Sequence, residues 1–508
     1  MLGLGLVLGL GGCGRHGNVA APAASPGRPP PADAPAWTYE IVASPGGAEL
    51  SVRASFAPGT DPELSVQEGA EPFVRDVEWA NASGWTAAPS RGGSWFVPSC
   101  AAGCHIRYRV ALAAAAREVD DVRVARATPP VPRPASAPPS PQAFASSPSS
   151  WLLRPVREWA GEEQGKQGTW FRFHVTVAPG DAFVTGVFPV PGAKDTYEGR
   201  TGDRFDLPYA AFGALRVHEI LDGQVELGIL PGALRNEADV VAWAETSAKT
   251  VLGYYGHFPV RRLLVLARPS SGGDGVGFGT TMGIAGAAIA IDVGADATAQ
   301  DFATDWVLVH EMVHTALPDL VGPHHWLEEG LATYVEPVAR AGAGLLGAPR
   351  VWAEWVHGMP QGEPARGDRG LDHTRTWGRT YWGGALFCLV ADLEIRERTG
   401  DKKTLRDALR AIDAASGGIA VAWPIDKVIE VGDFATGVPV LREVYDRMAN
   451  APAPVDLEAI WKGLGVVAAA DDERSVTFDD NAPLASIRRD WFRAATAAPG
   501  AAGEPRSQ

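Results

Sequence analysis

Residues 306–334 read WVLVHEMVHTALPDLVGPHHWLEEGLATY, and this stretch decides the fold of the chain around it. An apolar start leads into His310-Glu311-Met312-Val313-His314, a His-Glu-x-x-His pattern. In an α-helix, positions four apart lie on one face, so both imidazoles can bind one Zn²⁺ while Glu311 reaches a water held there. A proline follows closely at position 318. We therefore expect one helix from about Ala299 to Leu317.

A third zinc ligand should follow the second histidine, because catalytic zinc sites use three protein ligands and leave one position to water. The metzincin pattern is excluded, since this chain has leucine where that pattern requires glycine and histidine. A second helix is predicted to begin near Trp326, and it presents the adjacent carboxylates Glu328 and Glu329. His324 and His325 lie just before it and are rival ligands.

The segment WLEEGLATY (residues 326–334) resembles the W-L-x-E-G-x-A-x-Y helix of the gluzincin zinc peptidases. The resemblance implies that Glu329 is the third zinc ligand and puts Glu328 at a variable position, where a surface ion pair is the simpler role. The segment YWGGA (residues 381–385) is similar to a Y-x-x-G-A turn of the glycyl aminopeptidase family, whose tyrosine hydroxyl faces the scissile carbonyl. Tyr381 matches that tyrosine. An aromatic residue packing a helix start is the alternative for Tyr381.

The resemblance covers roughly residues 236–409 and implies a metallopeptidase that binds one Zn²⁺ per chain through His310, His314 and Glu329. Glu311 would act as general base on the attacking water, and Tyr381 would stabilise the developing oxyanion. The expected partner is a peptide or protein substrate.

Two other functions fit the same residues. The chain could be a surface-anchored binding lipoprotein whose zinc site is structural or vestigial, or a zinc hydrolase of non-peptide substrates. Glu311 argues against a structural site, which has no need of a base. In the related aminopeptidases, a glutamate on a strand before the zinc helix holds the substrate's amino group. Residues 279–286, GTTMGIAG, contain no acid, which leaves amino-terminal and internal cleavage both open.

The chain ahead of the zinc motif divides into two parts. Short strand-like runs between Gly and Pro residues predict a β-rich, sandwich-like region over residues 37–232, with a Pro/Ser-rich loop at 128–150. From Asn236 the pattern favours a capped helix to about Tyr255. A buried strand at 262–267, a glycine-rich loop at 270–279 and a strand at 286–292 follow.

The predicted fold class is therefore α+β. The β-rich region precedes a mainly helical domain over residues 233–495, which by resemblance is a thermolysin-like zinc metallopeptidase domain with C-terminal helices. A flexible tail is expected at 496–508. Lys+Arg 45 against Asp+Glu 60 gives a net charge of −15, and no Lys/Arg-rich run occurs, so nucleic acid is not an expected partner.

The N-terminus suggests export. Residues 10–13, LGGC, resemble a bacterial lipobox, which implies cleavage of a signal at 1–13, lipidation of Cys13 and a Pro/Ala-rich linker at 14–36. No Lys or Arg precedes the apolar run, so the usual basic start of a signal is missing, and an incidental cysteine in a glycine-rich N-terminus is the alternative. We expect a bacterial cell-envelope protein facing the periplasm or surface, with membrane contact only through Cys13.

The other cysteines fit this location. Cys100 and Cys104 flank a short glycine-containing loop, and a local disulfide between them would persist after export. Cys388 lies in an apolar helical run and is best explained as a small buried residue.

Overall fold

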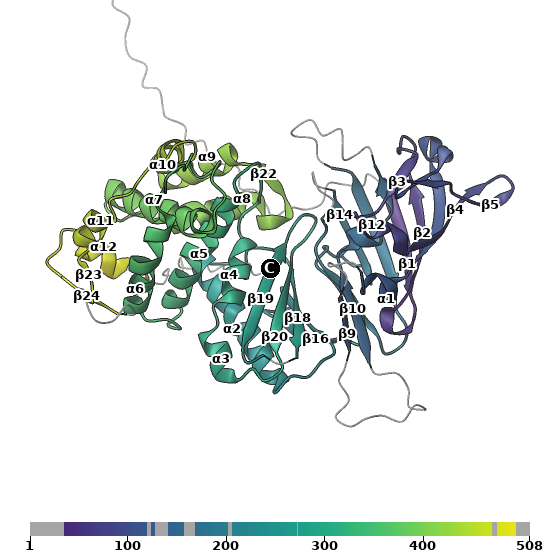
Figure 1. The fold of residues 1–508 in the computed structure, drawn as a ribbon, viewed down its shortest axis with the longest axis horizontal. Coiled ribbons are helices and arrows are strands. Elements are labelled where there is room, and N and C mark those ends of the chain that lie inside the picture. Colours follow the sequence, from purple (N-terminus) through teal and green to yellow (C-terminus); the bar gives the residue numbers. More distant parts are fainter. Residues whose placement is uncertain are drawn as a thin grey trace, which may run out of the picture.

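The computed structural model describes residues 35–118, 123–126, 141–156, 168–201, 206–271, 273–469 and 475–493. The predicted signal with Cys13 and the predicted tail at 496–508 lie outside the described residues. Two bodies lie side by side, one built of β-sheets and one of a sheet with helices (Figure 1). We call them the first half (residues 35–213) and the second half (residues 216–493).

The largest sheet of the first half has seven strands. Their order is β14 (Thr196–Arg200), β12 (Trp170–Thr176), β1 (Trp37–Ala43), β2 (Leu50–Phe56), β8 (Cys104–Val110), β4 (Val74–Asn81) and β5 (Gly84–Ala87). In β1, Trp37, Tyr39 and Ile41 are buried while the residues between them are more exposed. This alternation follows from the period of two in a strand, and it aims one face of the sheet at a core.

Two four-stranded sheets complete the first half. One has the order β13 (Ala182–Thr185), β15 (Ala210–Gly213), β10 (Gln142–Ser146) and β9 (Arg123–Arg126). The other has the order β11 (Arg154–Pro155), β3 (Glu63–Ser65), β7 (Ser94–Phe96) and β6 (Ser90–Arg91), and a short helix α1 (Leu112–Ala115) follows β8. The Trp151 ring contacts Phe173 of β12 and Phe212 of β15 with centroids 5.8 and 5.5 Å apart, so two of the sheets share one core.

Strand β10 differs from the sequence prediction, which placed a loop over residues 128–150. Residues 143–146 are buried and pair with β9 on one side and β15 on the other. The partner β15 lies more than sixty residues further along the sequence. Composition alone therefore missed the strand. The disulfide between Cys100 and Cys104 is present at the start of β8.

The second half contains a five-stranded sheet of order β16 (Arg216–Ile220), β17 (Val225–Ile229), β18 (Leu263–Ser270), β20 (Ala288–Gly294) and β19 (Val276–Met282). Strands β17, β18 and β20 are parallel, and β19 is antiparallel at the edge. The first two strands come from before residue 232, and β19 occupies part of the predicted glycine-rich loop. Leu263 and Val265 of β18 face the helices, whereas Leu264 faces Ala143 and Ala211 of the first half. Because both faces of β18 are covered, its buried part from Leu263 to Ala267 is continuously apolar.

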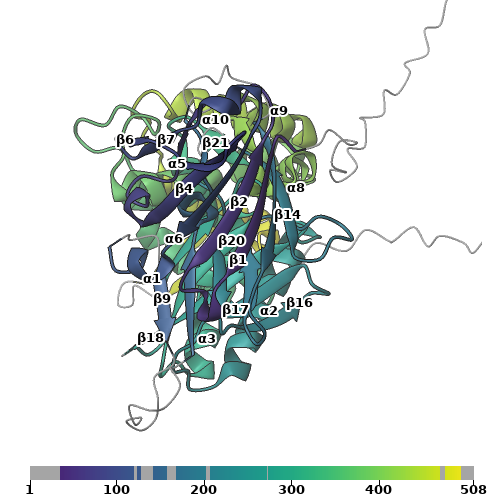
Figure 2. The ribbon, with the colours of Figure 1, turned by 90° about the vertical axis from the view of Figure 1, so that its right-hand side faces the viewer.

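Helices cover the other side of this sheet, as the turned view with the first half in front also shows (Figure 2). Helix α2 (Glu237–Tyr255) confirms the prediction, and the Asn236 side chain caps it by accepting from the Ala238 N–H. The single helix predicted over 299–317 is wrong, because α3 (Ala299–Thr304) and α4 (Val307–His314) are separate. Asp305 separates the two helices. Its carboxylate accepts hydrogen bonds from the N–H groups of Val307 and Leu308 and so starts a new helix.

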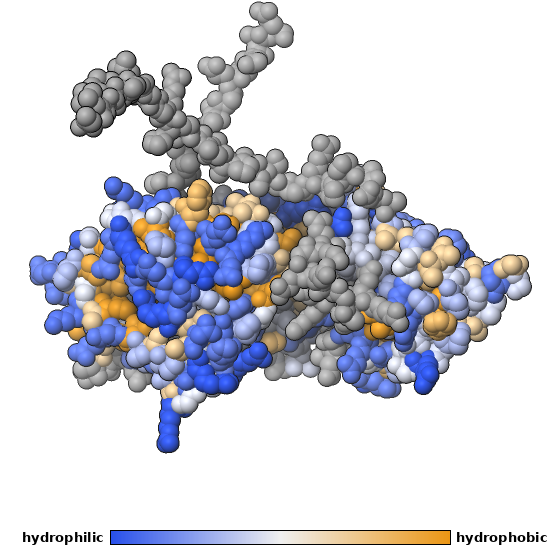
Figure 3. Space-filling view, turned by 90° about the horizontal axis from the view of Figure 1, so that it is seen from above, coloured by the Kyte–Doolittle hydropathy of each residue, from blue (hydrophilic) through white to orange (hydrophobic). Residues whose placement is uncertain are grey.

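The remaining helices and two small sheets follow. They are α5 (His325–Gly342), α6 (Ala348–Gly358), α7 (Gly384–Thr399), α8 (Leu405–Ser416), α9 (Ile425–Thr436), α10 (Val440–Met448), α11 (Leu457–Leu464), α12 (Ala485–Asp490), β21 (Asp319–Val321) with β22 (Ala422–Pro424), and β23 (Val466–Ala468) with β24 (Val476–Phe478). Cys388 is buried in α7, as predicted. Among the described residues, the helices are too short or too polar to cross a membrane. From above, hydrophobic and hydrophilic residues intermingle on the second half (Figure 3).

Candidate metal centre

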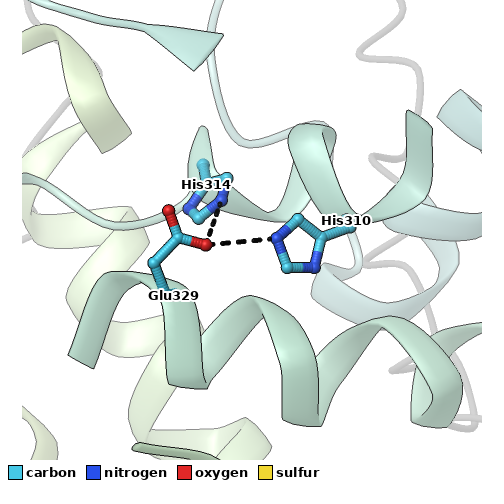
Figure 4. Close-up of side chains that lie close together, drawn as sticks. All are labelled: His310, His314 and Glu329. Carbon is cyan, nitrogen blue, oxygen red and sulfur yellow. Dashed lines mark hydrogen bonds and ion pairs between the residues drawn. The ribbon is translucent and has the colours of Figure 1, made fainter. Parts of the chain in front are cut away.

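Three side chains from α4 and α5 converge on one point (Figure 4). His310 and His314 lie one turn apart on α4, with ring centroids 5.0 Å apart. Glu329 of α5 brings its Oε2 to 3.4 Å from His310 Nε2 and 3.7 Å from His314 Nε2. Within the described part of the chain, these three residues form the one group of His, Cys, Asp or Glu whose donor atoms come close enough to hold a metal ion, all within 4.8 Å.

The donor set fits zinc. Zinc takes imidazole nitrogen and carboxylate oxygen at about 2.0–2.2 Å in a tetrahedron, which separates two donors by roughly 3.4 Å. The observed separations of 3.4 and 3.7 Å agree with this spacing. The side chains of His310, His314 and Glu329 are only 8, 12 and 15% exposed. A shared cation would compensate three polar groups that lie this close together and are this well shielded from water.

The surroundings of His314 and Glu329 shift the pKa of each group in the direction that suits metal binding. Burial, helped by the neighbouring His310, lowers the pKa of the His314 imidazole. Burial opposes ionisation of Glu329, but the contact with His310 and the nearby imidazoles hold the pKa of this carboxyl below its usual value. A neutral imidazole and an ionised carboxylate bind a divalent cation without first losing a proton.

Glu311 lies between the two histidines on α4 and is held by the edge strand β19. The Thr281 hydroxyl donates a hydrogen bond of 2.6 Å to Glu311 Oε2. A Cβ atom on Gly279 would lie 2.6 Å from Glu311 Cγ, so only glycine leaves room for this side chain. The sequence prediction did not include Thr281 or Gly279. Their spacing of two residues, which puts both on one face of a strand, is the signal that would have found them.

Tyr381 reaches the centre because two helices touch through glycine. A Cβ atom on Gly330 of α5 would lie 2.2 Å from Gly384 Cα, the first residue of α7. Residues 379–383 form a π-turn directly before α7, and Tyr381 lies in it. Burial raises the pKa of the Tyr381 phenol, and the carboxylates of Glu329 and Glu311 raise it further. The structure therefore brings Tyr381 close to the predicted ligand and the predicted base.

The rival ligands lie outside the donor group. His324 is buried, and its Nδ1 shares a hydrogen bond of 2.9 Å with Asp372. His325 is 69% exposed and lies between two carboxylates, with its Nδ1 3.2 Å from Glu328 Oε2 and its Nε2 3.5 Å from Glu329 Oε1. Glu328 also accepts a bond of 3.0 Å from the Leu320 N–H, so it ties β21 to α5. The structure does not place His324, His325 or Glu328 in the donor group.

Comparison with known proteins gives a fold likeness. No family model and no curated protein matches the chain. Among solved structures it is similar to an aminopeptidase N family protein from Idiomarina loihiensis, with a TM-score of 0.59 and 13% identity over 85% of this chain and 78% of that chain. A mutant M1 zinc metallopeptidase from Deinococcus radiodurans, bound to a Tyr-Ser-Ala substrate, has a TM-score of 0.47 and 14% identity over 82% of this chain and 95% of that one. The first likeness shows a shared fold, and the second is too distant to add to it.

Proposed function

We propose that this protein is a zinc-dependent metallopeptidase with a gluzincin-type centre in a thermolysin-like arrangement. One observation carries the proposal: His310, His314 and Glu329 converge while Glu311 and Tyr381 stand beside them. These three residues would hold the ion. When bound, zinc supplies a Lewis acid and makes a coordinated water a stronger nucleophile at neutral pH.

The protein's own side chains would then transfer the proton of the attacking water and stabilise the negative charge on the carbonyl oxygen. The Glu311 carboxylate, held by Thr281, accepts a proton from the water that attacks the peptide carbonyl and passes it to the leaving amine. A phenol with an ordinary pKa of about 10 is protonated at neutral pH. Tyr381 donates its hydroxyl hydrogen to the carbonyl oxygen, where negative charge develops.

Strand β19 is the proposed support for the substrate backbone. It is the last strand of its sheet, so one of its edges pairs with no other strand among those described, and it contains Gly279 and Thr281 beside the proposed base. An extended peptide can pair with such an edge. Residues 276–282 carry no carboxylate, which favours recognition by backbone pairing over capture of a free amino group.

Zinc content and peptide cleavage test the proposal together. We expect one zinc per chain in the wild type and in Glu311→Gln, with cleavage of a mixed peptide library only by the wild type. Glu328→Gln is the matched control, because it removes a neighbouring carboxylate outside the donor group and should leave cleavage nearly unchanged. Zinc without cleavage in the wild type would favour a binding protein. Full activity of Glu311→Gln would refute the assigned base.

We also propose export and lipid anchoring at Cys13. The lipobox-like sequence suggests it, and the Cys100–Cys104 disulfide is consistent with an oxidising compartment. Radiolabelled palmitate should enter the wild type in a bacterial host and not Cys13→Ser. Equal labelling of both proteins would contradict the proposal.

A further inference from the structure

Two tryptophans of the second half remain exposed, and both border the metal centre. Trp306 is 52% exposed and Trp377 is 62% exposed. The other tryptophans in the described part of this half are buried or partly buried, as Trp326 and Trp352 illustrate at 3 and 1%. An exposed indole does not gain the free energy that burial of apolar surface gives the other tryptophans, so its position calls for an explanation.

Each exposed ring contacts one residue of the centre. Trp306 precedes His310 by one helical turn, and its ring meets the imidazole edge to face, with centroids 5.5 Å apart. Trp377 precedes Tyr381 by the same interval, and these rings lie 5.7 Å apart and are inclined by 30°. Trp306 thus borders the site next to the proposed ligand His310, and Trp377 borders it next to the proposed oxyanion donor Tyr381.

Both rings stand on rigid supports. Asp305 fixes the start of α4 next to Trp306, because its carboxylate accepts from two backbone N–H groups and from Trp243 Nε1 at 2.9 Å. Arg379, two residues after Trp377, is 3% exposed and pairs with the buried carboxylate of Asp368 at 2.9 Å. Preorganised aromatic surfaces bind with little loss of conformational entropy, as the anchors of protein interfaces do.

We propose that Trp306 and Trp377 are walls of the substrate subsites and select peptides with bulky apolar or aromatic side chains next to the cleaved bond. The inference rests on the proposed function. A peptide bond placed between His310 and Tyr381 carries its nearest side chains past the two indoles, since residues follow one another at about 3.3 Å along an extended chain. Apolar side chains bury indole surface there, whereas charged ones lose hydration without gaining a partner.

Matched peptides test the inference. Two peptides of equal length differ only at the residues flanking the cleaved bond, which are Phe and Leu in one and Ser and Ser in the other. For the zinc-loaded wild type, we expect kcat/KM to favour the apolar peptide at least tenfold, and Trp306→Ala or Trp377→Ala to reduce that preference roughly tenfold. Trp→Phe variants at the same positions should restore most of it.

Phe434→Ala is the matched control. Phe434 is 79% exposed on α9, which packs on α8 and α10, so its removal should leave the preference at the wild-type value. Zinc content of every variant checks that the centre is intact. In a second arm, Kd of the apolar peptide is measured on zinc-loaded Glu311→Gln with and without Trp306→Ala, and a rise of about tenfold is expected.

The outcomes separate the two proposals. Equal cleavage of both peptides by the wild type, or a preference unchanged by both alanine substitutions, overturns the subsite assignment and leaves the peptidase standing. If zinc-loaded wild type cleaves no peptide, the proposed function fails. The binding arm then decides the inference alone: a tryptophan-dependent affinity for the apolar peptide supports the subsites, and its absence refutes them.

Discussion

The two halves bury different kinds of side chain. The core of the first half is aromatic and aliphatic, and its buried charged residues among those described are Arg154 and Glu198. The buried acidic, basic and histidine residues described in the second half are His310, Glu311, His324, Glu336, Arg340, Asp372, Arg379, Asp392, Arg396, Asp413 and Arg488. Burying a charge is costly unless it is paired. Folding of the second half therefore includes an unfavourable desolvation of charged groups that the first half largely avoids, and the candidate metal centre lies in this second half.

Asp372 shows how such a residue supports the centre. Its carboxylate shares hydrogen bonds with His324 Nδ1 at 2.9 Å, Trp326 Nε1 at 2.7 Å and the Tyr445 hydroxyl at 2.8 Å. His324 and Trp326 flank the first residue of α5. One buried carboxylate therefore fixes the start of the helix that carries Glu329.

Removing a proposed zinc ligand of the second half should have the largest effect of the substitutions considered. His310→Ala is expected to lose zinc and at least about a thousandfold in kcat/KM, because the remaining two donors bind the ion weakly. His357→Ala is the matched control, since it removes an exposed imidazole of α6 outside the donor group and should keep one zinc per chain. Metal analysis of the purified proteins measures both. Full zinc content in His310→Ala would contradict the ligand assignment.

Separating α5 from α7 should have the next largest effect. Gly330→Ala puts a methyl group 2.2 Å from Gly384 Cα, and we expect a loss of about 3 kcal/mol in the free energy of unfolding together with reduced activity. Gly253→Ala in α2 is the control, because no atom lies within 4 Å of its added Cβ. That variant should be unchanged or up to about 1 kcal/mol more stable. Chemical denaturation compares them, and equal effects would argue against helix contact as the cause.

Asp372→Asn tests whether the buried charge supports stability, with an expected loss of about 2 kcal/mol at pH 7. Burial opposes ionisation of Asp372, but the hydrogen bonds from His324, Trp326 and Tyr445 hold its pKa below the usual value. Since the pKa is lower in the folded state, the contribution is complete well above the unfolded pKa of about 3.9 and is lost as pH falls through the folded pKa. The difference between variant and wild type should therefore shrink from pH 5 to pH 3. A constant difference would contradict this account.

The smallest effect is expected for an ion pair of the first half. Glu78 lies 2.6 Å from Arg107 on the sheet surface, with side chains 31 and 42% exposed. Glu78→Gln should change the free energy of unfolding by less than about 1 kcal/mol, because water already solvates both charges. A thermal melt measures it. If Glu78→Gln lowered the free energy of unfolding as much as Asp372→Asn, charged pairs in the two halves would contribute equally, and the difference drawn between the halves would be wrong.

Local patterns allowed much of the second half to be predicted. The Asn236 cap and the apolar run of β18 give α2 and a buried strand, as expected. The break at Asp305 was missed because a single carboxylate, bonded to Trp243 far away in sequence, outweighs the helical pattern around it. Strand β10 was missed because part of its pairing is with β15, which is far away in the sequence, and composition does not reveal such a partner.

The sequence by itself determined that His310 and His314 share one face of a helix, since helical periodicity is a local property. The Trp-Leu-x-Glu-Gly run favoured Glu329 as the third donor only through its resemblance to the gluzincin helix. Only the tertiary structure decided that Glu329 meets those imidazoles, that Thr281 holds Glu311, and that the Gly330–Gly384 contact brings Tyr381 alongside. These contacts join elements separated along the chain. They depend on how helices and strands pack, which no single segment of sequence specifies.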